Sequence, residues 1–239
     1  MINSVAERHT AERVLQAAAH LLQTGGVDAL STRAVATAAG VQPPTLYRQF
    51  GDKDGMLDAV AAFVLRGYLE DKRRLLGEET DPLVAVRQMW DLHAEFGLTQ
   101  PECYQLIYCR PRPGVMPPAV EETRALLEQA IAHLADQGVL TMSVERATRL
   151  FSASVVGFVL TNIPVAPDER DQQEWAITRE NALSAIVGDL GEHPANPPTL
   201  VGRAAALREA LRDQQGPPLS PAERALLVEW LNQLTNQTA

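Results

Sequence analysis

The chain has 239 residues, of which 46% are hydrophobic and 21% are charged. These values are ordinary for a globular protein, and the length is sufficient for a sizeable buried core. No run of 18 apolar residues occurs, which excludes a membrane-spanning helix, and the first residues lack the basic and apolar segments of a signal peptide. Two cysteines, Cys103 and Cys109, are too few for a disulfide scaffold. We therefore expect a cytoplasmic protein without a membrane partner.

The net charge of −9 is unevenly distributed along the chain. Residues 1–54 carry five acidic and five basic side chains, so residues 55–239 carry the whole excess of acid. An acidic body argues against a protein that coats nucleic acid without selectivity, because phosphate neutralisation supplies most non-specific affinity. The neutral N-terminal segment can still bind DNA if its few cations share one face.

The residue pattern predicts an all-α protein, because Ala, Leu, Arg and Glu dominate and no stretch alternates with period two. The first helix is expected from about Thr10 to Thr24, with an apolar stripe along one side and Gly25-Gly26 at its end. A second, short helix follows Ser31, whose hydroxyl can cap free N–H groups, and stops near Gly40.

A third short helix is expected over Pro43–Phe50, because prolines are tolerated in a first turn, where N–H groups have no partner. Gly51-Asp52 then opens a fourth helix, which is expected to continue to about Leu76. The helices Ser31–Ala39 and Pro43–Phe50, joined by a tight glycine-containing turn, form a helix-turn-helix pattern.

The two short helices divide their side chains between an apolar and a polar face. Arginine and glutamine can each read a base edge with two hydrogen bonds, and a tyrosine hydroxyl can reach a phosphate. The side chains expected to lock the helices together are Val35, Ala38, Val41, Leu46 and Phe50. Those expected to point outward are Gln42, Thr45, Tyr47, Arg48 and Gln49.

Lys53 lies in the first turn of the expected fourth helix, where the helix dipole disfavours a cation. A phosphate nearby would reverse that preference, since helix N-termini bind anions. Thr32 and Arg33 occupy the same kind of position on the second helix.

The stretch STRAVATAAGVQPPTLYRQFGDKDGMLDAV, Ser31–Val60, resembles the TetR family of bacterial transcription regulators. Its AGV turn, its T-L-Y-R-x-F core and the D-K-D-x-x-L that follows occur in that family's order and spacing. With the first helix, the resemblance covers about Thr10 to Val60. The chain departs from the family pattern at Gln49, where histidine is commoner, and at the double proline, and both changes can alter operator preference.

The resemblance implies a helix-turn-helix DNA-binding domain at residues 1–54 and a helical regulatory and dimerisation domain at residues 55–239. It also implies a homodimer whose third helices enter the major groove at half-sites about one helical turn apart. Contacts to phosphates would come from Thr32, Arg33, Tyr47 and Lys53. Contacts to bases or nearby phosphates would come from Gln42, Pro44, Thr45 and Arg48.

Residues 60–239 resemble no family, but their helices can be outlined. Two adjacent helices, Ser143–Asn162 and Glu174–Leu190, could pair with their symmetry mates in a four-helix dimer bundle. The tail reads as two more helices, Leu200–Gln214 and Pro221–Gln233, which either pack on their own domain or extend the dimer interface. The other expected helices are Pro82–Gly97, Pro101–Arg110 and Pro118–Gln137.

An effector pocket is expected in the helical domain, because aromatic and histidine side chains gather on its central helices. An aromatic stripe at helical spacing is also what a plain core shows, so both interpretations stay open. Arg110 and Arg112 could bind an acidic ligand, although their proline-rich surroundings indicate a surface loop. The candidate ligand residues are Trp90, His93, Phe96, Tyr104, Tyr108 and Phe158.

Two other classes of function compete with a regulator. A thiol-dependent enzyme could use Cys103 with His93 or His133, but no glycine-rich phosphate loop or metal motif supports an enzyme, a cofactor or a metal site. An architectural DNA binder conflicts with the acidic body. The sequence therefore favours a ligand-responsive transcriptional repressor that binds duplex DNA and a small-molecule effector as a homodimer. An activator or a ligand-independent regulator of the same fold is the alternative.

Overall fold

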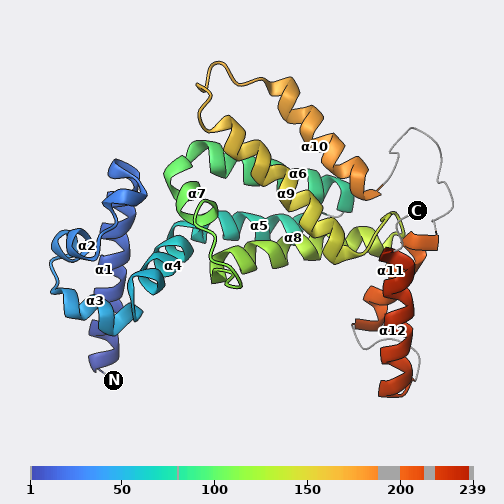
Figure 1. The fold of residues 1–239 in the computed structure, drawn as a ribbon, viewed down its shortest axis with the longest axis horizontal. Coiled ribbons are helices and arrows are strands. Elements are labelled where there is room, and N and C mark those ends of the chain that lie inside the picture. The colour runs from blue at the N-terminus through green and yellow to red at the C-terminus, as the bar shows by residue number, and fades with distance from the viewer. Residues whose placement is uncertain (1, 80, 188–199, 213–218, 237–239) are drawn as a thin grey trace. The chain divides into compact units, whose positions relative to one another are not determined.

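The structure, a computed structural model, describes residues 2–79, 81–187, 200–212 and 219–236. These residues form helices, with one isolated β-bridge between Arg112 and Val115 and no strand among them (Figure 1), which confirms the all-α prediction. The ends predicted for two helices, at Leu190 and Gln214, lie outside the described residues. In chain order the helices are α1 (Ile2–Gly25), the 3-10 helix η1 (Val27–Ala29), α2 (Thr32–Ala39), α3 (Pro43–Phe50), α4 (Lys53–Val64), α5 (Arg66–Glu78), α6 (Pro82–Thr99), α7 (Pro101–Tyr108), α8 (Pro118–Asp136), α9 (Val144–Asn162), α10 (Gln172–Val187), α11 (Leu200–Arg212) and α12 (Pro221–Asn236).

The chain divides into two compact units. The first comprises Met1–Asp71 and Glu95–Thr123, and the second comprises Lys72–Ala94 and Arg124–Ala239. Within the first unit, α7 packs against α1, η1 and α4, and the domain boundary predicted after residue 54 stays a prediction.

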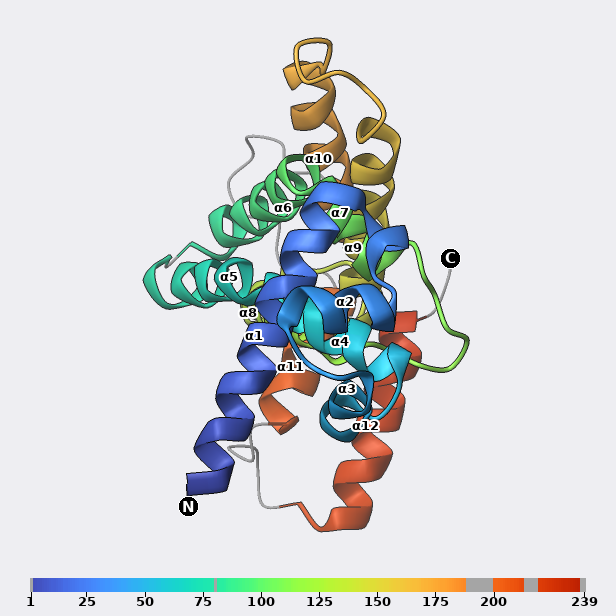
Figure 2. The same cartoon turned by 90° about the vertical axis from the view of Figure 1, so that its left-hand side faces the viewer.

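The first unit is built on the apolar stripe of α1, where Val14, Ala18 and Leu22 are fully buried at intervals of four residues. Helix α1 packs against α2 and α4 and lies beside them in both views (Figures 1 and 2). It begins at Ile2, eight residues before the predicted start at Thr10. The prediction was wrong because it followed the apolar stripe, whereas no proline or glycine interrupts the polar turns before it.

The predicted fourth helix is two helices. Helix α4 ends at Val64 and α5 begins at Arg66, whereas the sequence pattern predicted one helix as far as Leu76. Leu65 between them is fully buried, and its N–H still donates to the Ala61 carbonyl at 3.0 Å, so the interruption is local. No proline marks it, and Gly67 is the nearest poor helix former.

The core of the second unit is centred on Trp90 of α6, which is fully buried. Its ring lies 5.4 Å from that of Phe151 and 6.1 Å from that of Phe158, measured between centroids, and both partners are on α9. Helix α10 packs on α9 and is tied to α6 by Arg179, whose guanidinium donates to Asp91 at 2.7 Å. The predicted helices of this region are present, with bounds that differ by a few residues.

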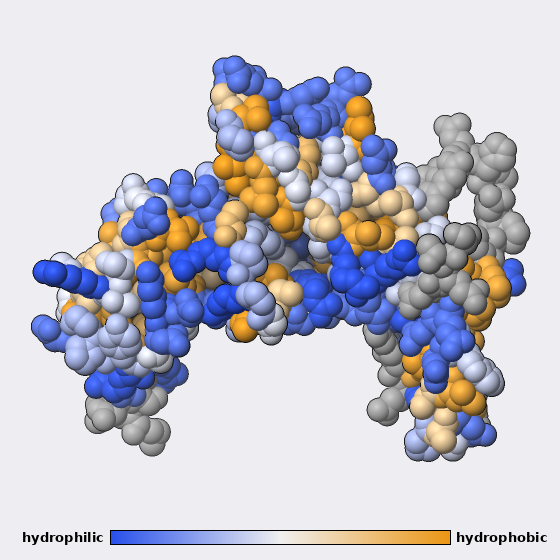
Figure 3. All heavy atoms as spheres, in the orientation of Figure 1, coloured by the Kyte–Doolittle hydropathy of each residue, from blue (hydrophilic) through white to orange (hydrophobic). Residues whose placement is uncertain are grey.

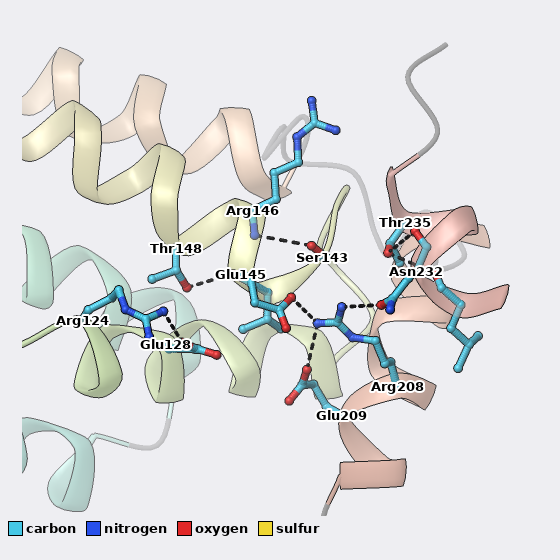
Figure 4. A network of polar contacts seen from close by, with 12 residues as sticks. Arg124, Glu128, Ser143, Glu145, Arg146, Thr148, Arg208, Glu209, Asn232 and Thr235 are labelled. Carbon is cyan, nitrogen blue, oxygen red and sulfur yellow. Dashed lines mark hydrogen bonds and ion pairs between the residues drawn. The ribbon is translucent and has the colours of Figure 1, made fainter. Parts of the chain in front are cut away.

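The tail helices α11 and α12 pack against each other around Ala204, Leu211 and Leu231. Buried Arg208 of α11 pairs with Glu145 in the first turn of α9 and donates to Asn232 of α12 at 2.8 Å (Figure 4). These bonds join α11 to α9 and α12, and whether the tail also extends a dimer interface stays a prediction.

The first turn of α12 is the capping box that the sequence predicts. The Glu223 N–H donates to Ser220 Oγ at 3.3 Å, and the Ser220 N–H donates to the Glu223 carboxylate at 2.9 Å. Apolar side chains nevertheless reach the surface on α11 and α12 (Figure 3), among them Trp230, which is 54% exposed. None of the helices in the described ranges combines the length and the apolar character needed to cross a bilayer.

Candidate nucleic-acid interface

Local signals in the sequence position the two helices of the motif. Ser31 is the N-cap of α2, and its Oγ accepts the N–H of Ala34 at 3.1 Å. Gly40 ends the helix with φ of +64°, a left-handed conformation that glycine adopts without strain. Gln42 in extended conformation then leads into α3, whose two prolines occupy its first positions.

The interior of the motif differs from the prediction at one position. Leu46 and Val35 are buried as expected, and Val41 and Phe50 are half-buried. Ala38, predicted to be internal, is exposed, and the buried alanines of α2 are Ala36 and Ala39. The prediction was wrong because the buried face of so short a helix follows positions i, i+1 and i+4 from Val35.

The side chains predicted to contact DNA all reach the surface of the first unit. Thr32 and Thr45 are half-buried, and Tyr47 is 49% exposed. No ion pair involves Arg33, Arg48 or Lys53 in the part of the chain that the structure describes, so these cations are available to a partner. The exposed members of the predicted set are Arg33, Gln42, Pro44, Tyr47, Arg48 and Lys53.

The start of α4 is held close to the end of α3. Asp52 caps α4 by accepting the N–H of Gly55 at 2.7 Å, and Lys53 is the first residue of the helix. A Cβ at Gly55 would lie 2.1 Å from the carbonyl oxygen of Phe50, so only glycine permits this approach. The backbone of the first turn of α4, which begins at Lys53, is thereby set beside the C-terminal end of α3.

Gln49 does not point outward as predicted. Its Nε2 donates to the carbonyl of Glu7 on α1 at 3.2 Å, and its Oε1 is buried without a hydrogen-bond partner. Arg13 of α1 likewise donates to the carbonyl of Ala39 at 3.3 Å. The prediction was wrong because it placed Gln49 by helical spacing within α3 and could not include the early turns of α1.

Arg112, considered from the sequence as a ligand for an acid, already has a carboxylate partner. Its NH2 group donates to both carboxylate oxygens of Asp58 on α4 at 2.7 Å, and these hydrogen bonds raise the pKa of the guanidinium. No local signal connects residues 54 positions apart, so sequence analysis missed this pair.

The six candidate effector residues form two groups, one in each unit. In the second unit, Trp90 and Phe158 are in contact and His93 is buried. In the first unit, ring centroids lie 6.4 Å apart for Phe96 and Tyr104, and 4.5 Å apart for Tyr104 and Tyr108. Effector binding by either group stays a prediction, since burial of this extent is also that of a core.

The interior of the second unit contains two buried basic side chains, Lys72 and His93. Burial lowers the pKa of Lys72 to about 7. Burial, and then the charge of Lys72, lower the pKa of His93 well below its usual value. Ionisable side chains are rarely buried so completely, and the sequence pattern did not single out Lys72.

The two cysteines differ in their surroundings, and Cys103 is buried. Burial raises the pKa of the Cys103 thiol, whereas a nucleophilic cysteine needs a lowered value. Cys109 is exposed. Within the described residues, no group of three or more His, Cys, Asp or Glu side chains could hold a metal ion.

A short capped helix, a left-handed glycine turn, and a second helix with a polar outer edge define a helix-turn-helix DNA-binding domain at the N-terminus of an all-helical chain. The family described as "Bacterial regulatory proteins, tetR family" matches residues 14–60. Residues 14–60 are therefore similar to the N-terminal domain of that family.

Two curated relatives match the chain over part of their length. The nucleoid occlusion factor SlmA of Vibrio vulnificus is 32% identical over 91 residues, which are 38% of this chain and 46% of that protein. The class A tetracycline repressor protein from transposon 1721 of Escherichia coli is 48% identical over 52 residues, 22% of this chain and 24% of that protein. The chain thus matches less than half of the length of either relative.

Among solved structures, the chain is similar to Thermus thermophilus FadR, a TetR-family transcriptional repressor crystallised with lauroyl-CoA. The two share 22% sequence identity and a TM-score of 0.58, over 78% of this chain and 100% of that one. The likeness shows that most of the chain has the same all-helical fold.

Proposed function

We propose that this protein is a transcriptional regulator that binds a palindromic DNA operator as a homodimer. The observation that carries the proposal is the outer edge of α3 and the start of α4, where Tyr47, Arg48 and Lys53 are exposed and the two cations make no ion pair with any described residue. These side chains lie within residues 14–60, which match the TetR family. The buried side of the same helices supplies the rigid support that such an edge needs.

In the proposed complex, α3 lies in the major groove. Arg48 and Gln42 face base edges, where both residue types can form two hydrogen bonds. Tyr47 and Lys53 hold phosphates, and the N–H groups at the start of α4 add to the attraction. Thr32 and Arg33 at the start of α2 hold phosphates in the same way, and Pro44 and Thr45 lie against the groove.

The proposed dimer forms through α9 and α10. Helix α9 leaves Leu150, Ala153 and Gly157 exposed at intervals of three or four residues, and α10 leaves Ile177 52% exposed. An exposed face of small and apolar residues can pair with the same face of a second copy of the chain around a two-fold axis. The dimer would set the two recognition helices one helical turn of DNA apart.

Repression by occupancy of the operator, relieved by a small molecule in the helical body, is the proposed mode of regulation. An effector releases DNA only if it prefers the conformation that does not bind DNA, and the operator must then weaken effector binding by the same factor. We infer no enzymatic reaction for the chain. We expect the protein in the cytoplasm, where its DNA partner is. Activation by the same operator complex is the alternative mode.

The test of the proposed function is selection of DNA from a random pool of duplexes by the purified protein. We expect enrichment of one short palindrome with half-sites about one helical turn apart. Arg48→Ala/Lys53→Ala should fail to enrich it, whereas Arg203→Ala, which removes an exposed arginine of α11, should behave as the unaltered protein. The proposal fails if the unaltered protein enriches no sequence, or if the double variant enriches the same palindrome equally well.

A further inference from the structure

Arg112 joins the connection between α7 and α8 to α4. The two carboxylate oxygens of Asp58 lie 2.7 Å from its NH2 group, and a carboxylate oxygen of Asp54 lies 3.9 Å from its NH1 group. Asp54 and Asp58 are one turn apart on the same face of α4. One guanidinium thus spans the first two turns of α4.

The backbone that presents Arg112 is itself held in a tight turn. The N–H of Val115 donates to the Arg112 carbonyl at 3.0 Å, and Gly114 has φ of +75°. Pro111 and Pro113 on either side of Arg112 restrict the backbone further. A backbone already held in such a turn loses little further conformational freedom when Arg112 pairs.

The Arg112–Asp58 pair borders a cavity that is also lined by apolar side chains of α4 and α7. Leu57 of α4 and Leu106 and Ile107 of α7 line a cavity of about 370 Å³, together with Asp58 and Arg112. Helix α4 is therefore held on one side by apolar packing on α7 and by an ionic contact with the α7–α8 connection.

The two turns held in this way are those that carry the proposed DNA contacts of α4. Lys53 precedes Asp54 directly, and Gly55 lies under the Phe50 carbonyl at the end of α3. Because this approach leaves no room for a Cβ, the start of α4 cannot move toward the end of α3 without displacing it.

We propose that Arg112 is a positioning residue of the DNA interface: it contacts no DNA but, through Asp58, holds α4 where Lys53 and the recognition helix α3 fit the operator. This inference rests on the proposed function. Because Arg112 is distant in sequence from the helix-turn-helix motif, sequence analysis does not identify this role.

A purely electrostatic role makes the opposite prediction for one variant. Arg112 also offsets the negative charges of Asp52, Asp54 and Asp58, which raise the pKa of the guanidinium. If only charge mattered, Asp58→Asn would tighten DNA binding by removing an acid near the phosphates. If position matters, Asp58→Asn weakens binding as Arg112→Ala does, because both remove the same contact.

The experiment measures affinity for the duplex selected by the unaltered protein. We expect Arg112→Ala and Asp58→Asn each to weaken binding by about five- to thirtyfold, and the double variant to lose no more than either, since both act on one contact. The exchanged pair Arg112→Asp/Asp58→Arg should recover most of the affinity. Arg110→Ala is the matched control, because Arg110 is exposed at the same cavity without an ion pair and has the same charge.

Hydrogen exchange of the free protein provides a readout that does not need DNA. Amides of the first two turns of α4 should exchange faster in Arg112→Ala and Asp58→Asn than in Arg110→Ala, while the core of the second unit keeps its protection. Both residues of the pair remain partly exposed, at 31% and 28% of the side chain, so the variants should fold.

Tighter DNA binding by Asp58→Asn, or equal affinities for Arg112→Ala and Arg110→Ala, would overturn the inference. Unchanged exchange in α4 would do so as well. If the unaltered protein selects no duplex, the proposed function fails first, and faster α4 exchange in Arg112→Ala would still show that Arg112 holds the helix.

Discussion

Basic side chains are exposed in the helix-turn-helix and buried in the core of the second unit. Around α3, the cations Arg33, Arg48 and Lys53 are exposed and make no ion pair in the described structure. In the second unit, Lys72 and His93 are buried beneath the surface. A cation left in water is available to a charged partner at no folding cost, whereas a buried one lowers stability unless its surroundings compensate.

Aromatic side chains differ between the two regions in the same way. Tyr47 on α3 is half exposed, and Trp90 on α6 is fully buried between the rings of Phe151 and Phe158. We therefore expect removal of side chains in the first region to affect binding, and removal of side chains in the second to affect folding. Four predictions measure how sharp this separation is.

Trp90→Ala should give the largest loss of stability. It leaves a cavity in the core and should lower the free energy of unfolding by about 3–5 kcal/mol, measured by urea denaturation. Tyr47→Ala is the matched aromatic change at the surface and should cost less than about 0.5 kcal/mol while weakening operator binding. A loss at Trp90 no larger than that at Tyr47 would contradict the contrast.

Lys72→Met should stabilise the protein by roughly 3–5 kcal/mol at pH 7, because a one-unit pKa shift corresponds to about 1.4 kcal/mol. The pKa of Lys72 is lowered from 10.5 to about 7 by burial, so between these values the unfolded chain binds more protons than the folded one. Stability should then rise with pH, by about 2 kcal/mol from pH 7 to pH 9.

Among the other shifted groups, the Cys103 thiol contributes in this range: burial raises its pKa, so its deprotonation in the unfolded chain offsets part of the rise, equally in the unaltered protein and in Lys72→Met. His93 titrates well below this range, and the tyrosines with raised pKa values titrate above it. Denaturation curves of Lys72→Met should lack the rise. A stability of the unaltered protein that falls from pH 7 to pH 9 would show that burial of Lys72 is not destabilising.

Arg48→Ala and Lys53→Ala should change binding and not stability. Loss of a base-edge contact at Arg48 should weaken operator binding by about 1–3 kcal/mol. If Lys53 holds a phosphate, Lys53→Ala should reduce the slope of log affinity against log salt by about 0.9. Titrations at several salt concentrations, with Arg203→Ala as control, test both, and a salt slope unchanged in Lys53→Ala would remove it from the interface.

Ser31→Ala should have the smallest effect and should act on both properties. Loss of the hydroxyl that accepts the Ala34 N–H should cost about 1 kcal/mol of stability. Operator binding should weaken only slightly, because the cap supports α2 and not α3. Ser31→Asp, which can accept the same bond, should restore stability in thermal denaturation. If it does not, the cap is not the cause.

Most of the first region was predictable because its signals are local. The Ser31 cap, the Gly40 turn, the prolines at the start of α3 and the Asp52 cap act within four residues of their own position. The helices of the second unit were predictable for the same reason. Two helix boundaries were not predictable. The start of α1 at Ile2 depends on the lack of a proline or glycine before the apolar stripe, and the interruption between α4 and α5 lies at buried Leu65.

Contacts between distant segments could be found only in the folded chain. Gln49 turns toward Glu7, Arg112 pairs with Asp58, and Lys72 becomes a buried neighbour of His93, although nothing in the flanking residues distinguishes these side chains. Helical periodicity states which face of one helix a residue occupies, but not which helix covers that face. Residue order alone thus specified the helices and the DNA-binding motif, and packing between helices decided which polar groups are exposed to a partner and which are held inside.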